Sequence, residues 1–154
     1  MQKKIFTLLL LLFLTSCGYE AMHSKKNTIN YNFSISEINF NGDREINQKI
    51  KAKLNNYTLD KKDKNFILKI SSNSKKTTLS KDVQGNATNF QKTIAISVEV
   101  LMNDKFKNRF IIMENFDYNN NSNKFDLRKY EKEIKNNLTE TAVDRLIFKL
   151  SIIQ

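Results

Sequence analysis

The sequence predicts an α+β fold, a two-layer sandwich in which two helices cover one face of a four-stranded, mixed and mostly antiparallel sheet. Segments with apolar residues at every second position and segments with helical spacing follow one another in the order β-α-β-β-β-α. Each segment has one dominant apolar face, and 154 residues with 40% apolar content suit a single domain. Two layers bury all of these faces at once.

The first strand and the first helix lie within residues 31–54. Apolar residues alternate through Ile35 and change phase before Ile38, which predicts a strand with a bulge between them. Asp43 follows a polar break and is the expected N-cap of the helix. The helix carries one narrow apolar face: Ile46, Ile50 and Leu54. That face is expected to pack on the sheet.

Three further strands are expected in the middle of the chain. Apolar and polar residues alternate through residues 66–79, less regularly toward the end of that range. Gly85 marks a polar turn, and residues 90–102 show the clearest alternation in the chain. A tight turn at residues 103–105 leads into a returning strand, which carries Phe110, Ile112 and Phe116. Residues 119–123 are an Asn-rich loop that ends this strand.

The last helix is predicted by apolar residues at helical spacing through residues 127–150, with Asp126 as the expected N-cap. Its apolar face widens toward the C-terminus, so that end should be the more buried. The sheet and this helix are expected to share one core: Ile96, Val98, Val100, Leu138, Ala142 and Leu146.

Residues 1–16 have the pattern of a lipoprotein signal peptide. Lys3 and Lys4 precede an apolar run that is about half as long as a bilayer span, and small residues follow it. Cys17, the one cysteine of the chain, stands where a bacterial lipobox has its thiol. We expect cleavage before Cys17 and its modification by diacylglycerol and an amide-linked acyl chain such as palmitate, which together anchor a protein stably. The alternative is a signal peptide with an incidental cysteine.

Residues 17–28 are polar and are expected to form a lipidated tether, and residues 29–154 a single domain. Loss of Lys3 and Lys4 with the signal peptide lowers the net charge from +10 to +8, which favours anionic partners. An exported lipoprotein meets lipid phosphates, lipopolysaccharide and acidic proteins rather than nucleic acid. The alternative is that the charge reflects only a lysine-rich composition.

Catalysis is not expected. His23, the one histidine, lies in the tether, where it has no pocket in which to act as a base. No Gly-rich phosphate loop, HExxH motif or CxxC pair is present, so neither a metal nor a cofactor is expected. A small hydrolase would need a nucleophile and a base that the sequence does not single out.

Cys17, Gly18 and Tyr19, the order of elements, the Asn-rich loop and the closing helix at residues 140–150 together resemble the LptE family of lipopolysaccharide-assembly lipoproteins. The resemblance implies a lipid-anchored protein of the outer membrane that faces the periplasm. It also implies that the chain partners and plugs an LptD-type β-barrel and binds lipopolysaccharide, without covalent chemistry. The alternative is an envelope-scaffolding lipoprotein that binds another protein or the cell wall.

A candidate lipopolysaccharide site follows from counting chain reversals. If the first helix is a crossover, the first two strands are parallel and both end at the same end of the sheet. The fourth strand runs back to that end, so the Asn-rich loop that follows it lies there too. The cations expected there are Arg44, Lys81, Lys124, Arg128 and Lys129. Helix N-termini at the same end would add partial positive charge for phosphate groups. The alternative is that these are solvated loop cations without a common ligand.

Overall fold

The computed structural model describes residues 32–153, so the signal peptide, Cys17, His23 and the tether lie outside the described residues. The elements follow the predicted order: β1 (Ser34–Gly42), α2 (Arg44–Leu54), a 3-10 turn (Asn55–Tyr57), β2 (Asn65–Lys81), β3 (Ala87–Met102), β4 (Lys105–Asn119) and α3 (Lys124–Ser151). The α+β fold class is confirmed.

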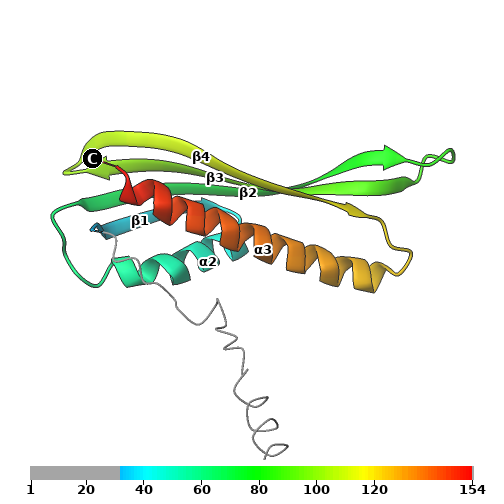
Figure 1. Cartoon of the computed structure of the whole chain (residues 1–154), viewed down its shortest axis with the longest axis horizontal. Coiled ribbons are helices and arrows are strands. Elements are labelled where there is room, and N and C mark those ends of the chain that lie inside the picture. Colours follow the sequence, from blue (N-terminus) through cyan, green and yellow to red (C-terminus); the bar gives the residue numbers. More distant parts are fainter. Residues whose placement is uncertain (1–31, 154) are drawn as a thin grey trace, which may run out of the picture. The chain divides into compact units, whose positions relative to one another are not determined.

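The strands lie in the order β1-β2-β3-β4, with β1 parallel to β2 and the other pairs antiparallel. Both helices cover the same face of this sheet (Figure 1). The register shifts between Ile35 and Glu37, which confirms the expected bulge. The β3–β4 turn places Asn103 and Asp104 at φ angles of 52° and 59°, as a two-residue hairpin turn requires.

The predicted N-cap of α2 is confirmed, and the predicted N-cap of α3 is wrong. Asp43 accepts hydrogen bonds from the backbone N–H groups of Glu45 and Ile46, as expected. The cap of α3 is Asn123 rather than Asp126, because the Asn123 side chain already accepts from the N–H groups that open the helix. Asp126 lies in the first turn, where its charge suits the helix dipole.

The helices and the sheet enclose two clusters of buried side chains. The larger joins α2, α3 and all four strands, and it contains five of the six expected core residues: Ile96, Val98, Val100, Ala142 and Leu146. The sixth, Leu138, is partly buried and packs against both clusters. The smaller cluster lies where α3 begins and consists of Phe90, Tyr118, Leu127 and Ile134.

Phe116 lies on β4 as expected, but its side chain is 45% exposed, whereas Tyr118 two residues later is 5% exposed. β4 is an edge strand that pairs only with β3 within residues 32–153, so side chains along it have packing partners on one side only. Tyr118 is buried because it packs against Phe90 and Tyr130.

The strands differ in length, and this difference positions the rest of the molecule. Gly42, the last residue of β1, pairs with Ser72, nine residues before β2 ends at Lys81. The β2–β3 hairpin therefore extends roughly 30 Å beyond β1, as Figure 1 shows. We call the end of the domain at which β1 begins the tether end, and the end at which β2 turns into β3 the hairpin end.

Candidate functional site

The hairpin end brings together segments that are distant in sequence. Lys81 pairs with Ala87 across the hairpin, and the backbone oxygen of Ala87 accepts a 2.7 Å hydrogen bond from the Asn120 side chain. The Asn120 backbone N–H donates to Thr88 at 2.7 Å. These bonds hold the Asn-rich loop, and with it the start of α3, against the β2–β3 hairpin.

Four of the five expected cations lie on the segments that meet here: Lys81, Lys124, Arg128 and Lys129. The Lys124 Nζ is held 3.3 Å from both the Asn120 side-chain oxygen and the Asn121 backbone oxygen. Arg128 and Lys129 are exposed in the second turn of α3. The dipole of α3 adds partial positive charge to this surface, although the Asn123 side chain already accepts from the N–H groups of Phe125 and Asp126.

Arg44 does not join this group. It opens α2 beside Gly42, and the Lys135 Nζ on α3 lies 2.8 Å from the cap residue Asp43. Lys135 is eleven residues beyond Lys124, or about 16 Å along the helix. The expected grouping fails at this residue because β1 is much shorter than β2, so the two parallel strands end at different heights.

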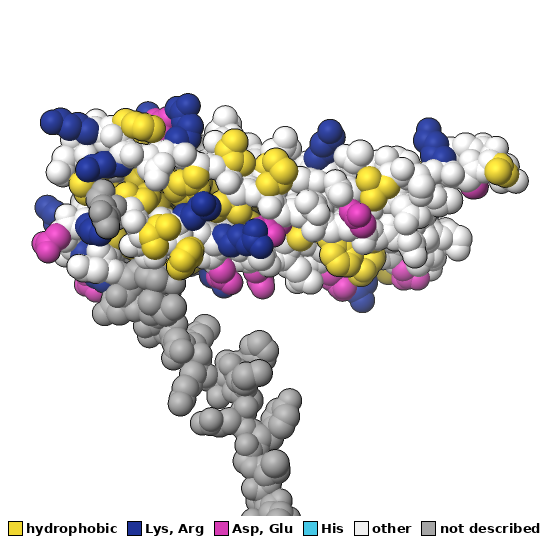
Figure 2. Space-filling view, turned by 45° about the horizontal axis from the view of Figure 1, so that its top comes forward, with side chains coloured by type: hydrophobic (Ala, Val, Ile, Leu, Met, Phe, Trp, Pro, Cys, Tyr) yellow, Lys and Arg dark blue, Asp and Glu magenta, His cyan; other side chains and the backbone are white. Residues whose placement is uncertain are grey.

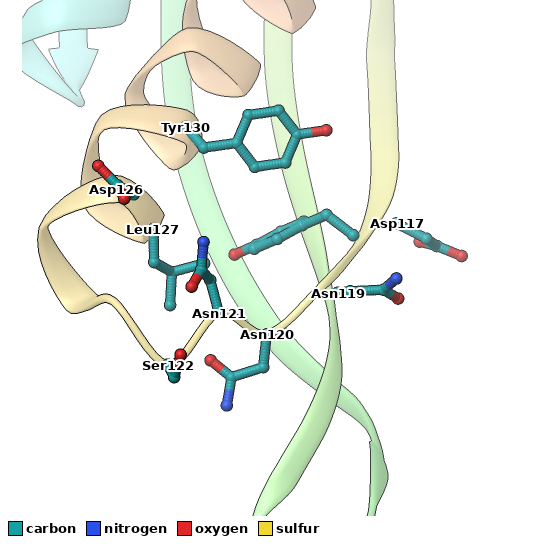
Figure 3. Close-up of a pocket in the computed structure, with 9 residues that line it drawn as sticks. Asp117, Asn119, Asn120, Asn121, Ser122, Asp126, Leu127 and Tyr130 are labelled. Atoms are coloured by element: carbon teal, nitrogen blue, oxygen red, sulfur yellow. The ribbon is translucent and has the colours of Figure 1, made fainter.

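A cleft of about 660 Å³ opens between the last residues of β4, the Asn-rich loop and the first turns of α3. The cations do not line it, and its charged lining residues are Asp117 and Asp126. Asn120, Asn121 and Ser122 lie on the loop below Leu127, while the more distant Asp117 and Asn119 point away from the helix (Figure 3). The Tyr130 ring, 43% exposed, forms its aromatic wall. Amide groups beside an aromatic ring can hydrogen-bond hydroxyl groups and cover the apolar face of a sugar.

A polar network supports the floor of the cleft. The Glu131 carboxylate accepts hydrogen bonds from Tyr118 at 2.9 Å and from Lys76 at 2.5 Å, and the Lys76 Nζ lies 3.7 Å from the centre of the Phe90 ring. Burial and the neighbouring carboxylate raise the pKa of Tyr118. Although burial opposes it, the donors Lys76 and Tyr118 lower the pKa of Glu131. Tyr118 therefore stays a neutral donor and Glu131 a charged acceptor at neutral pH.

The hairpin tip beyond Lys81 is ordered by Asp82. Its carboxylate accepts from the backbone N–H groups of Gln84 and Asn86 and from the Asn86 side chain, and these bonds lower the pKa of Asp82. The Val83 side chain at this tip is fully exposed.

The cleft was not predicted from the sequence. Residues 119–123 have the pattern of a low-complexity loop, because asparagine is abundant throughout the chain. The signal that was available is the position of this run, between a strand that carries Tyr118 near its end and a helix that presents Tyr130 in its second turn.

Residues 32–153 contain no group of three His, Cys, Asp or Glu side chains that could hold a metal ion. Within the same residues, no helix is long and apolar enough to cross a membrane. Acylation of Cys17 stays a prediction, since that residue lies outside the described part of the chain.

No protein-family model and no curated protein matches the sequence. Several solved structures match the fold, among them three lipoproteins. Rare lipoprotein B from Shewanella oneidensis is 16% identical with a TM-score of 0.58, and the match covers 75% of this chain and 93% of that one. A minor lipoprotein from Acinetobacter baumannii is 8% identical with a TM-score of 0.58, over 79% and 91%.

The third structure, an uncharacterized lipoprotein B from Nitrosomonas europaea, is 11% identical with a TM-score of 0.56, and the match covers 79% of this chain and 86% of that one. At such low identities the similarity concerns the backbone alone. It nevertheless extends over most of each of the three proteins. The domain described here therefore has the fold of these bacterial lipoproteins.

Proposed function

We propose that this chain is a lipoprotein of the LptE type, anchored through Cys17 to the outer membrane and facing the periplasm. In this role it partners and plugs an LptD-type β-barrel and binds lipopolysaccharide during its assembly at the outer membrane. The observation that carries the proposal is a fold shared with solved lipoproteins over 86–93% of their length, downstream of a lipobox cysteine. Binding and positioning, rather than covalent chemistry, are the proposed activity.

The hairpin end is the proposed lipopolysaccharide site. Lipopolysaccharide carries phosphate groups on sugars, and this end offers both kinds of partner. Lys81, Arg128 and Lys129 supply exposed cations for phosphates, and the Asn-rich cleft supplies amide groups for hydroxyls. Exposed charges of this kind act at short range and are screened by salt.

Replacing Lys81, Arg128 and Lys129 together with serine tests the site. We expect weaker lipopolysaccharide binding and a shallower dependence of affinity on salt, because three phosphate partners are lost. The matched control is the triple serine variant of Lys51, Lys53 and Lys75, which removes the same charge from exposed positions outside the hairpin end. An equal loss in both variants, or no loss in either, would refute the hairpin-end site.

The anchor is tested at the mature N-terminus. Mass spectrometry of envelope-derived protein should find Cys17 as the first residue with its thiol and amine acylated, and the Cys17→Ala chain should remain uncleaved or soluble. A free thiol at Cys17 in the envelope-derived protein would contradict the anchor.

A further inference from the structure

Three segments meet at the tether end of the domain, beside the start of β1. The Ser34 N–H donates to the Lys64 backbone oxygen at 2.8 Å, and the Lys64 Nζ donates to the backbone oxygen of Ile153 at 3.0 Å. Phe66 at the start of β2 pairs with Met102 at the end of β3. The β2 start, the β3–β4 turn and the end of α3 therefore share one end of the domain (Figure 1).

Exposed apolar side chains lie on the loop that leads into β2, at the β3–β4 turn and at the end of α3. They are Leu59 (72% exposed), Phe106 (61%), Phe148 (57%) and Ile152 (61%). None of the four belongs to either buried cluster. Phe106 pairs with Leu101 on the sheet face opposite the helices, whereas Phe148 and Ile152 lie at the end of α3, so the surface that they share is the end of the domain rather than either face. Single exposed apolar residues are ordinary, but four such side chains at one end indicate a surface that something apolar covers.

Lysines lie next to these side chains in the sequence. Residues 59–64, 103–107 and 148–152 contain six lysines and three aspartates: Lys61, Lys62, Lys64, Lys105, Lys107 and Lys149, with Asp60, Asp63 and Asp104. Figure 2 shows Lys and Arg side chains at this end of the domain with hydrophobic side chains between them. Large apolar side chains set among lysines are typical of surfaces that lie on anionic membranes.

The chain also enters the domain here. Cys17 and Phe33 are sixteen Cα-to-Cα steps apart, which can span at most about 55 Å. A bilayer that holds an acylated Cys17 is thus within reach of the tether end. The hairpin end lies a further 55 Å or so away, along the seventeen residues of β2.

We propose that the tether end docks on the anionic phospholipid surface that holds the Cys17 anchor, with Phe106 and its apolar neighbours at the headgroup boundary and the lysines on lipid phosphates. The choice of this membrane rests on the proposed anchoring of Cys17. The contact itself depends only on described residues of the domain and goes beyond binding of a barrel or of lipopolysaccharide.

The chain contains no tryptophan, so a single introduced one reports on its own surroundings. The Phe106→Trp protein, full-length and acylated, is reconstituted into phosphatidylcholine–phosphatidylglycerol vesicles with brominated acyl chains. We expect its emission to shift to the blue and to be quenched by the bromines. The matched Val83→Trp protein places its probe at the fully exposed hairpin tip and should show neither effect. Equal emission and quenching in the two proteins would overturn the proposal, as would a blue shift without quenching.

Charge is tested separately in the unacylated Cys17→Ser protein by its binding to the same vesicles. Lys105→Gln with Lys107→Gln should weaken binding about 25-fold, since each lysine near an anionic surface contributes roughly fivefold. Lys51→Gln with Lys75→Gln removes the same charge from exposed positions outside both proposed sites and should have far less effect. Equal losses would overturn the proposal.

The two arms separate this inference from the anchor. Vesicle binding through the tether end by the Cys17→Ser protein, together with a free thiol in the native chain, would retain the docking surface and remove the anchor. Acylated Cys17 with an unquenched Phe106→Trp probe would retain the anchor and remove the docking surface. Circular dichroism checks that each variant is folded.

Discussion

Replacing Leu146 with alanine tests how α3 is held on the sheet. Leu146 has no exposed surface and belongs to the larger cluster, which joins both helices to all four strands. The substitution removes the equivalent of about two to three methylenes, or roughly 2 kcal/mol of transfer free energy. A residual cavity adds to this, because strands and helices that pack from several sides cannot all move in to fill it. We expect a loss of about 3 kcal/mol.

Equilibrium unfolding in urea, followed by circular dichroism, measures this loss. The midpoint should fall while the slope stays unchanged, since the same surface is exposed on unfolding. Two substitutions on the same helix provide comparisons. Leu127→Ala lies in the smaller cluster near the open cleft and should cost less, about 1–2 kcal/mol, and exposed Glu133→Ala should stay within about 0.5 kcal/mol. A loss below about 0.5 kcal/mol at Leu146 would refute the packing of α3.

Two further predictions concern a strand end and a helix cap. Gly42 and Gly85 both have positive φ angles, of 92° and 86°, but a Cβ at Gly42 would lie 1.9 Å from the Ser72 backbone oxygen, whereas Gly85 has open space. Gly42→Ala should therefore cost more than about 3 kcal/mol and Gly85→Ala about 1 kcal/mol, and similar costs in urea unfolding would contradict the close approach. Although burial opposes it, the hydrogen bond from Lys135 lowers the pKa of Asp43 below 3.8, so this ion pair stabilises the fold above that pH and is lost as the pH falls through the lowered pKa. Asp43→Asn, which keeps the cap, should reduce the acid loss of stability between pH 5 and 2, and an unchanged pH profile would rule out this contribution.

The sequence predicted those elements in which one face is buried along its whole length. Apolar residues stand at every second position of β3, because helices cover one face of this central strand. The buried ones are Ile94, Ile96, Val98 and Val100. Asp43 was predictable as a cap because it follows a glycine and precedes a regular apolar spacing. Both features depend on local periodicity, which a single sequence displays.

The predictions that were wrong depend on how distant segments pair and pack, which is not a local property of the sequence. The position of Arg44 depends on Gly42 lying opposite Ser72, which the pattern within either strand does not specify. Several residues between Asn119 and Asp126 could cap α3, and the choice of Asn123 depends on how Asn120 is bound to the hairpin. The exposure of Phe116 likewise depends on tertiary contacts, because Ile112 and Tyr118 on the same edge strand are only 3% and 5% exposed.

Copurification tests the central claim most directly. The full chain with an affinity tag is recovered from detergent-solubilised envelopes, and its partners are identified and their stoichiometry measured. The proposed role predicts equimolar recovery of a large outer-membrane β-barrel of the LptD type, with lipopolysaccharide bound to the complex. Recovery of a cell-wall fragment or a different envelope protein in place of such a barrel would contradict it and favour the scaffolding interpretation.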